Sequence, residues 1–296
     1  MKTYSDYLAS IFPDYKVQKI SINAGFSCPN RDGTIGTGGC IYCRNDSFTP
    51  SYCFDTKDIK QQIEAGKIFF RRKYPGMKFI AYFQSYSNTY SSDIIQLESL
   101  YKSALECEDI VGLAIGTRPD ILPDNILDLL GGITRHIPVF LEIGAETSFD
   151  STLSLINRNH TWKDVVDAVC RANERGLHCG LHLIAGLPGE TAQMIYQTVE
   201  KACGLPIETL KFHQLQILYG TPLHQLYCNS AIDCIPLSSE KYIEICAEIL
   251  KIVPENIIIE RFVAQSPPEL VFAPKWNLKN YQFMQKLRNH LSSQEV

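Results

Sequence analysis

The chain has 296 residues, of which 45% are apolar, and a formal net charge of −4. Its length allows either one barrel-sized domain or two smaller domains. Its charge excludes a strongly basic nucleic-acid binder but leaves a local basic patch open. The apolar runs are far shorter than the roughly 18 residues of a membrane helix, and the start lacks the apolar core of a signal peptide, so we expect a soluble, cytoplasmic protein without a membrane partner.

Short apolar segments alternate with longer amphipathic segments from about Val17 onward. This rhythm is typical of βα units that build a parallel sheet. No repeat or linker interrupts it, so we predict one α/β barrel, with a further strand after Ile257 and a terminal helix from about Asn280. The predicted strands are 17–24, 78–84, 110–116, 139–144, 177–185 and 210–218, and the predicted helices are 58–73, 92–106, 124–134, 150–175, 191–203 and 239–251.

Distinctive motifs follow the predicted strands one after another. A cysteine-containing loop follows the first strand, QSYSNTY the second, GTRPD the third, GAET the fourth and AGLPGE the fifth. Ligands of parallel α/β sheets and barrels bind at the carboxyl ends of the strands, where these loops meet. The motifs therefore predict one ligand site at that end of the barrel.

Three of the eleven cysteines, Cys28, Cys40 and Cys43, lie in the loop CPNRDGTIGTGGCIYC. A C-x-x-C pair can bind one metal ion or two corners of a cluster, and the glycines let the loop fold back and direct backbone N–H groups at an anionic cluster. Three ligands on a four-iron cluster leave one iron open, as in a catalytic metal site. Two alternatives stay open at this point: a structural zinc site that recruits Cys53, and a redox pair at Cys40 and Cys43.

The other cysteines do not indicate disulfides, because the cytosol keeps thiols reduced. Most lie in helix-like apolar patterns and are expected to be buried as small hydrophobic side chains. Four histidines, His160, His178, His182 and His213, are candidates for proton transfer or for a structural role. His182 and His213 would face one region if their strands are neighbours, and we predict these two as the catalytic pair.

In their order along the chain, these motifs resemble the radical SAM superfamily, and within it the YhcC/YtqA-type subgroup related to the radical SAM domain of the Elongator catalytic subunit. The resemblance extends from Ile20 to about Leu278. No single motif is specific, but their order and their places at successive strand ends are. The matching stretches are CPNRDGTIGTGGCIYC, YFQSYSNTY, GTRPD, the block from LEIGAET to INRNH, HLIAGLPGE and FAPKWN.

The resemblance implies a partial (βα)6 TIM-like barrel of radical SAM type over residues 1–255, with residues 256–296 as a C-terminal extension that packs on the barrel. It implies a [4Fe–4S] cluster on Cys28, Cys40 and Cys43, with S-adenosylmethionine bound to the open iron. One electron, from a flavodoxin- or ferredoxin-type donor, would cleave S-adenosylmethionine to a 5′-deoxyadenosyl radical that abstracts hydrogen from the substrate.

The resemblance also implies contacts to the methionine part of S-adenosylmethionine. Gln84, Ser85 and Tyr86 stand where many relatives carry a Gly-Gly-Glu contact to the amino group, so backbone carbonyls are expected to take that role here. Thr117 and Arg118 end the third strand. Arg118 would pair with the carboxylate through its planar fork, or would form a surface salt bridge instead.

For the nucleoside part, Tyr42 is expected beside the adenine. Glu142 and Glu146 lie four residues apart, hence on one side if the strand stays extended, and Glu146 stands where relatives often carry Gln. Both are predicted to contact the cofactor. Backbone contacts to the adenine are implied for Ile184, Ala185 and Gly186.

The substrate implied by the resemblance is the side chain of a tRNA wobble uridine. No acetyltransferase-like segment follows Leu291, so acetyl transfer is not expected. One alternative is a radical SAM enzyme for a small metabolite or tetrapyrrole, although coproporphyrinogen oxidases of that kind space their first cysteines more closely. The other is a non-enzymatic, zinc-stabilised module that binds RNA or protein.

Overall fold

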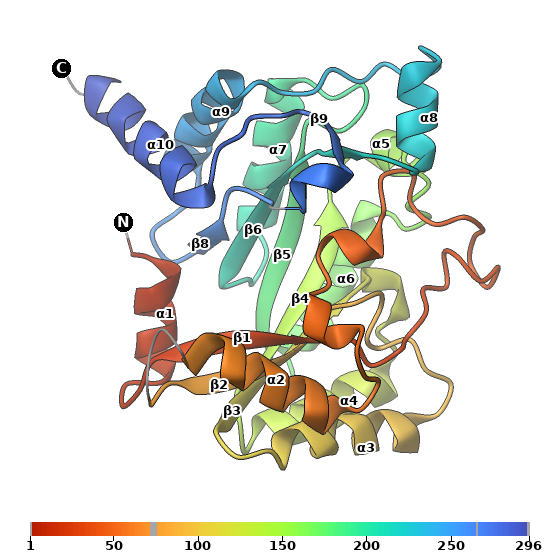
Figure 1. The fold of residues 1–296 in the computed structure, drawn as a ribbon, viewed down its shortest axis with the longest axis vertical. Helices are drawn as coiled ribbons and strands as arrows, with labels where there is room; N and C mark the ends of the chain where they lie inside the picture. The colour runs from red at the N-terminus through yellow and green to blue at the C-terminus, as the bar shows by residue number, and fades with distance from the viewer. Residues whose placement is uncertain (1, 72–75, 265, 295–296) are drawn as a thin grey trace.

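The computed structural model describes residues 2–71, 76–264 and 266–294. Its centre is a seven-stranded parallel sheet curled into a half-barrel, with the strand order β1-β2-β3-β4-β5-β6-β8 (Figure 1). The partial TIM-like barrel is thus confirmed, and β8 is the further strand predicted after Ile257. The strands are β1 (Val17–Ile22), β2 (Lys78–Phe83), β3 (Ile110–Thr117), β4 (Val139–Glu146), β5 (His178–Ala185), β6 (Thr209–Gln214) and β8 (Ile258–Arg261), and a separate antiparallel pair joins β7 (Ile217–Leu218) and β9 (Val271–Ala273).

Most helices follow a strand and cover the outer face of the sheet, as βα units require. The apolar face of each of these helices packs on Val, Ile, Leu and Phe side chains of the strands. The predicted helix 58–73 begins at Ile59, and its last two positions, 72 and 73, lie outside the described residues. The helices are α1 (Tyr4–Ile11), α2 (Ile59–Arg71), α3 (Ile94–Leu105), α4 (Asp124–Thr134), α5 (Asp150–Leu155), α6 (Trp162–Asn173), α7 (Ala192–Cys203), α8 (Pro222–Cys228), α9 (Ser239–Ile252) and α10 (Asn280–Gln294).

The prediction of one helix over residues 150–175 is wrong. The helix breaks after α5, and α6 begins only after Thr161, whose hydroxyl accepts from the Asp164 N–H in a capping box. Between them, Asn157 and Asn159 adopt left-handed conformations with φ of 55° and 58°, which asparagine tolerates better than most residues. The break produces a loop that contacts the cysteines.

The strands alternate between the helix-covered face and the interior of the half-barrel, which we call the lumen. On β1, Ile20 and Ile22 pack under the helices, and Lys19 therefore points into the lumen. Helix α1, which the sequence pattern did not predict, closes the bottom of the lumen by packing Leu8 and Phe12 among aromatic and aliphatic side chains of β2 to β4.

The two edges of the half-barrel, β1 and β8, do not pair with each other. Lys19 of β1 instead forms an ion pair with Glu260 of β8, at 2.8 Å. After residue 255 the chain contributes β8 to the sheet and then packs α10 on α9 (Figure 1). Within the described residues, no helix combines the length and apolarity needed to cross a membrane.

Candidate functional site

The three cysteines of the loop after β1 lie in one electrostatic environment at the carboxyl end of the sheet. The Cys43 N–H donates to the Cys40 carbonyl at 3.0 Å, which turns the C-x-x-C segment back on itself. Burial raises the pKa of the Cys43 thiol to about 11, the neighbouring Cys40 and Cys28 thiols add to the rise, and Arg31 opposes it. Cys28 and Cys40 therefore lie near enough to Cys43 to influence its charge.

Two buried donors point at the sulfur of Cys40. Arg158 Nη1 lies 3.7 Å from Sγ, and Asn30 Nδ2 lies 3.6 Å from it. A buried cation and a buried amide beside a sulfur favour its anionic form. Three cysteines in one loop, one of them with such donors, are a ligand set that suits an anionic iron–sulfur cluster.

Asparagines attach the cysteine loop to the loop between α5 and α6. Asn157 Nδ2 donates to the Gly39 carbonyl at 2.8 Å, Asn30 Nδ2 donates to the Asn157 carbonyl at 2.6 Å, and Asn159 Nδ2 donates to Asn30 Oδ1 at 2.6 Å. Because both loops carry these bonds, the position of the cysteines depends on the break between the two helices.

Replacing Gly36 by alanine tests this attachment. A Cβ at Gly36 would lie 2.4 Å from Asn30 Oδ1 and 2.5 Å from Asn159 Nδ2, so we expect the substitution to lower the free energy of unfolding by about 1–3 kcal/mol and to reduce bound iron per chain. Thermal unfolding and iron analysis measure both effects. Gly132→Ala in α4, whose Cβ meets nothing within 4 Å, is the matched control and should be neutral or stabilising; equal behaviour of the two variants would contradict the attachment.

Cys53, the fourth ligand of the alternative zinc site, contacts a different part of the structure. Its buried thiol donates to the Ser21 carbonyl at 3.3 Å. In the described ranges, no three His, Cys, Asp or Glu side chains converge closely enough to hold a single metal ion.

The residues predicted for the methionine part of the cofactor lie together at the ends of β2 and β3. Gln84 Oε1 accepts from the Ser21 hydroxyl at 2.7 Å, and Tyr86 has a left-handed φ of 62°. The remaining hydroxyls in this group pair with neighbouring hydroxyls: Ser85 with Thr49 at 3.0 Å, and Thr117 with Thr89 at 2.6 Å.

Arg118 is almost fully buried, with 2% of its surface exposed. It donates to Asp120 at 2.9 and 2.7 Å and to the Arg158 carbonyl at 2.8 Å. Its Nη1 is buried and has no hydrogen-bond partner among the described residues. The ion pair with Asp120 is therefore not a surface salt bridge, and the described residues leave the hydrogen-bonding capacity of Nη1 unused.

Two residues predicted at the adenine, Tyr42 and Ile184, pack in the same apolar cluster, with Leu187 and Leu215. Gly186 has a φ of 86°, and a Cβ there would lie 3.0 Å from Leu237, so only glycine suits this close approach. The Ala185 carbonyl already accepts from the Leu215 N–H at 2.8 Å.

Glu142 and Glu146 are separated rather than brought to one site. The strand does not stay extended, because the register shifts between Gly144 and Glu146, and Glu146 has a left-handed φ of 65°. Glu146 lies 3.2 Å from Arg158, near the cysteines. Glu142 points into the lumen, where lysines surround it.

Four charged side chains form an ion ring across the lumen: Lys19, Glu142, Lys211 and Glu260. Lys211 lies 2.8 Å from Glu142 and 3.0 Å from Glu260, and Lys19 pairs with both carboxylates. Burial disfavours the Glu142 carboxylate, but the charges of Lys19 and Lys211 outweigh burial and hold its pKa well below its ordinary value. The ion ring was not predicted, although a charged residue in the middle of a strand buried on both faces is a signal for such a cluster.

The two histidines predicted as catalytic lie next to each other on β5 and β6, with ring centroids 5.5 Å apart. His182 Nε2 lies 2.7 Å from Glu142 Oε2. Among the described residues, His213 has only Arg261 as a polar neighbour within hydrogen-bond distance. His160 lies elsewhere and accepts from Arg158 Nε at 3.0 Å; burial and that arginine lower its pKa to about 2, so it stays neutral.

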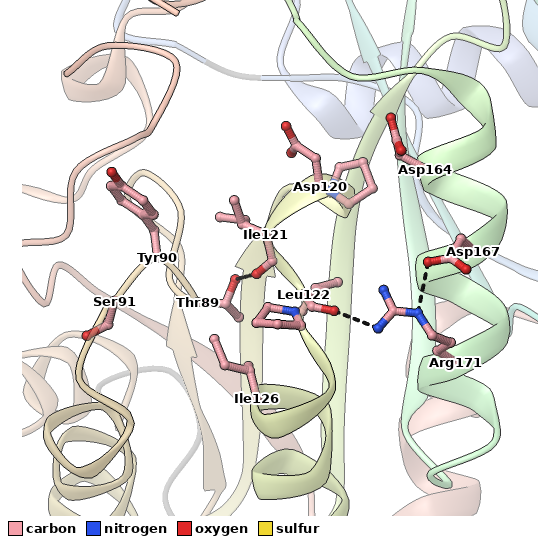
Figure 2. Close-up of a pocket in the computed structure, with 12 residues that line it drawn as sticks. Thr89, Tyr90, Ser91, Asp120, Ile121, Leu122, Ile126, Asp164, Asp167 and Arg171 are labelled. Carbon is pink, nitrogen blue, oxygen red and sulfur yellow. Dashed lines mark hydrogen bonds and ion pairs between the residues drawn. The ribbon is translucent and has the colours of Figure 1, made fainter. Parts of the chain in front are cut away.

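A cavity of about 470 Å³ lies outside the lumen, between the segment after β3 and helix α6 (Figure 2). Its one lining arginine is paired: Arg171 donates to Asp167 at 2.8 Å and to the Leu122 carbonyl at 2.9 Å. None of the predicted site residues lines it.

Comparisons with known proteins find related sequences over most of the chain. Residues 32–202 match the model of the radical SAM superfamily, and residues 207–293 match that of a radical SAM C-terminal domain. The chain is 32% identical to the uncharacterised protein YtqA of Bacillus subtilis, covering 94% of this chain and 86% of YtqA, and 34% identical to protein YhcC of Escherichia coli K12, covering 95% and 89%.

Similarity extends to proteins of tRNA modification and to solved structures. A tRNA uridine(34) acetyltransferase of Methanocaldococcus jannaschii is 25% identical over 185 residues, which are 60% of this chain and 33% of that protein. The structure of Elp3 from Methanocaldococcus infernus superposes with a TM-score of 0.73 at 16% identity, covering 95% of this chain and 63% of that chain. Coproporphyrinogen III oxidase from Escherichia coli gives 0.53 at 16% identity, covering 84% and 55%. Both structures share the fold.

Proposed function

Because the chain belongs to the radical SAM superfamily, whose enzymes use a [4Fe–4S] cluster and S-adenosylmethionine, we propose that it holds such a cluster on Cys28, Cys40 and Cys43. We further propose that it cleaves S-adenosylmethionine reductively, with a flavodoxin or ferredoxin as electron donor. The family is one of enzymes, so a non-enzymatic zinc-stabilised module is not supported.

The observation that carries this proposal is the environment of Cys40. Its sulfur is buried and has Arg158 and Asn30 as donors, an arrangement that favours an anionic ligand and lowers the cost of placing a negative cluster inside the protein. The ion pair of Arg158 with Glu146 and its bond to the Gly144 carbonyl at 2.8 Å fix the guanidinium in this position.

When bound, the cluster and S-adenosylmethionine supply the radical chemistry. The residues of the chain hold and orient the bound molecules. The free Nη1 donor of Arg118 suits a carboxylate, and Tyr42 and Ile184 offer an apolar wall for an aromatic base. The aromatic floor of the lumen, closed by α1, excludes water from below.

We propose the side chain of a tRNA wobble uridine as the substrate. Similarity to proteins named as tRNA uridine(34) acetyltransferases supports this choice. Aromatic and basic residues gathered around β7 and β9 also support it: Tyr219 is 39% exposed, Phe272 packs on it with a centroid distance of 5.4 Å, and Lys275 lies 6.0 Å from its ring. Unpaired bases in RNA are bound by stacking on such side chains.

Two measurements test the proposal. Anaerobically reconstituted protein should be brown and should form 5′-deoxyadenosine from S-adenosylmethionine when reduced; absence of this product contradicts the enzymatic part. Bulk tRNA from cells without the gene should lose one modified wobble uridine or accumulate its precursor, and the wild-type gene, but not Cys40→Ala, should restore it. An unchanged wobble-uridine profile contradicts the tRNA substrate.

A further inference from the structure

The ion ring in the lumen is balanced in charge. Two lysines face two carboxylates, and every carboxylate contacts both lysines. Glu142 accepts in addition from the Tyr82 hydroxyl at 2.6 Å. The ring therefore has no carboxylate to spare for a further cation.

Arg261, the last residue of β8, is a further cation beside the ion ring. It stands opposite Lys211 in the pairing of β6 with β8, at the carboxyl end of the sheet and next to the balanced ring. The described ranges contain no carboxylate within ion-pair distance of Arg261. Its Nη2 contacts only the His213 ring, at 3.2 Å from Nε2, and its Nε is buried without a hydrogen-bond partner.

The groups around Arg261 do not compensate its charge. Lys211 of β6 is itself cationic, and Tyr242 of α9 donates its hydroxyl to the Phe262 carbonyl at 2.6 Å. Burial, and then the charge of Arg261, lower the pKa of His213 well below its ordinary value, so this histidine is neutral. His182, beside His213, already pairs with Glu142. The lumen wall thus carries one uncompensated positive charge.

A guanidinium has five N–H donors in a planar fork that matches a carboxylate or a phosphate. Of the three guanidinium nitrogens of Arg261, only Nη2 has a hydrogen-bond contact among the described residues, and its partner is the neutral ring of His213. A partly buried cation of this kind is costly unless an anion joins it. Because Arg261 is the last residue of β8, it lies toward the carboxyl end of the parallel sheet, the end that the cysteine loop follows at β1, and an anion held there would orient the rest of a bound molecule within the lumen.

We propose that Arg261, with His213 beside it, binds an anionic group of the substrate, either a carboxylate or a phosphate, in the barrel lumen. This inference rests on the proposed function, which makes the lumen the reaction chamber. Arg261 anchors the anion through its fork, and neutral His213 donates or accepts a further hydrogen bond from the bound group. On this proposal, the part of the substrate that enters the lumen carries a carboxylate or a phosphate.

The test uses reconstituted full-length protein under anaerobic conditions and small probes. Acetate and methyl phosphate represent the two anion chemistries, and acetamide is the neutral counterpart of acetate. The arginine Nε–H signals in ¹⁵N NMR spectra report binding, and the signal that disappears in Arg261→Gln identifies Arg261. The matched control is Arg288→Gln on exposed α10, which removes the same charge far from the lumen.

In the wild type and in Arg288→Gln, we expect acetate or methyl phosphate to shift the Arg261 signal saturably, whereas acetamide does not. Histidine ring signals should shift at the same anion concentrations. The apparent affinity for the anion, measured from these histidine shifts, should fall by about tenfold or more in Arg261→Gln. Arg261→Lys keeps the positive charge but loses the planar guanidinium, so this variant should retain part of the affinity for the anion. Which anion binds more tightly distinguishes a carboxylate from a phosphate.

No saturable shift with either anion in the wild type, or equal affinity in the wild type and Arg261→Gln, overturns the anion site. These readouts are independent of the proposed function. Failure of the proposed function appears as an absence of 5′-deoxyadenosine from the wild-type protein, whatever the anions do. If Arg261→Gln does not fold, the signal that disappears in Arg261→Lys identifies Arg261, and the response of that signal in the wild type decides the question.

Discussion

Protein with Cys40 replaced by alanine should bind no [4Fe–4S] cluster and should form no 5′-deoxyadenosine above background. Three thiolates are the minimum that holds this cluster while leaving one iron open, so loss of one removes the site. Cys40 is the cysteine whose sulfur has two buried donors, and its loss leaves Arg158 without that partner. Visible absorption after reconstitution, iron and sulfide content, and product formation measure the effect.

The matched control is Cys53→Ala. Cys53 is also buried, but its thiol donates to the Ser21 carbonyl, away from the other three. We expect this variant to keep the full cluster and the full product yield, with only the modest loss of stability that follows removal of one buried sulfur. Colourless protein that binds zinc and loses the zinc in both variants would instead establish the four-cysteine zinc site.

The fold was largely predictable, because period and length distinguish short buried strands from amphipathic helices. Five of the six predicted strands lie within two residues of their observed positions, whereas the predicted strand 210–218 divides into β6 and β7, which belong to different sheets. The helix break before Trp162 was missed, although Thr161 followed three residues later by Asp164 is a capping signal. Helix α1 was missed because its packing against β2 to β4 is a tertiary contact.

The site was predictable only in part. The motifs locate the strand ends, but they do not show which side chain of one motif reaches another. Arg158 contacts a cysteine 118 residues away in sequence, and its role depends on the loop that the single predicted helix would have removed. Glu142 was expected at the cofactor with Glu146. Glu142 keeps the regular register of β4 and pairs with lysines of β1 and β6, whereas the register shift after Gly144 turns Glu146 toward Arg158. A pattern within one strand cannot reveal these pairings.

Glu142→Gln is expected to lower the free energy of unfolding by about 3–5 kcal/mol, because it removes one carboxylate from a buried ion ring and leaves two lysines with one counter-charge. Glu142 contacts Lys19, Lys211, His182 and Tyr82 at once. Urea unfolding monitored by circular dichroism gives the free energy. The matched control is Glu244→Gln. Glu244 is an exposed ion-pair partner of Lys241, and its substitution should change the free energy of unfolding by less than about 1 kcal/mol.

The Glu142 carboxylate also makes the stability of the folded protein depend on pH. The pKa of Glu142 in the folded protein lies well below its ordinary value of 4.5, so its contribution to stability is fully present above about pH 4.5 and is lost as the pH falls toward the folded-state pKa. Glu142→Gln should therefore lose less stability than the wild type on acidification below pH 4.5. If the cost comes from the unbalanced lysines, adding Lys211→Met to Glu142→Gln should recover part of the lost free energy. A double variant whose loss equals the sum of the two single losses would show instead that the ring members act independently.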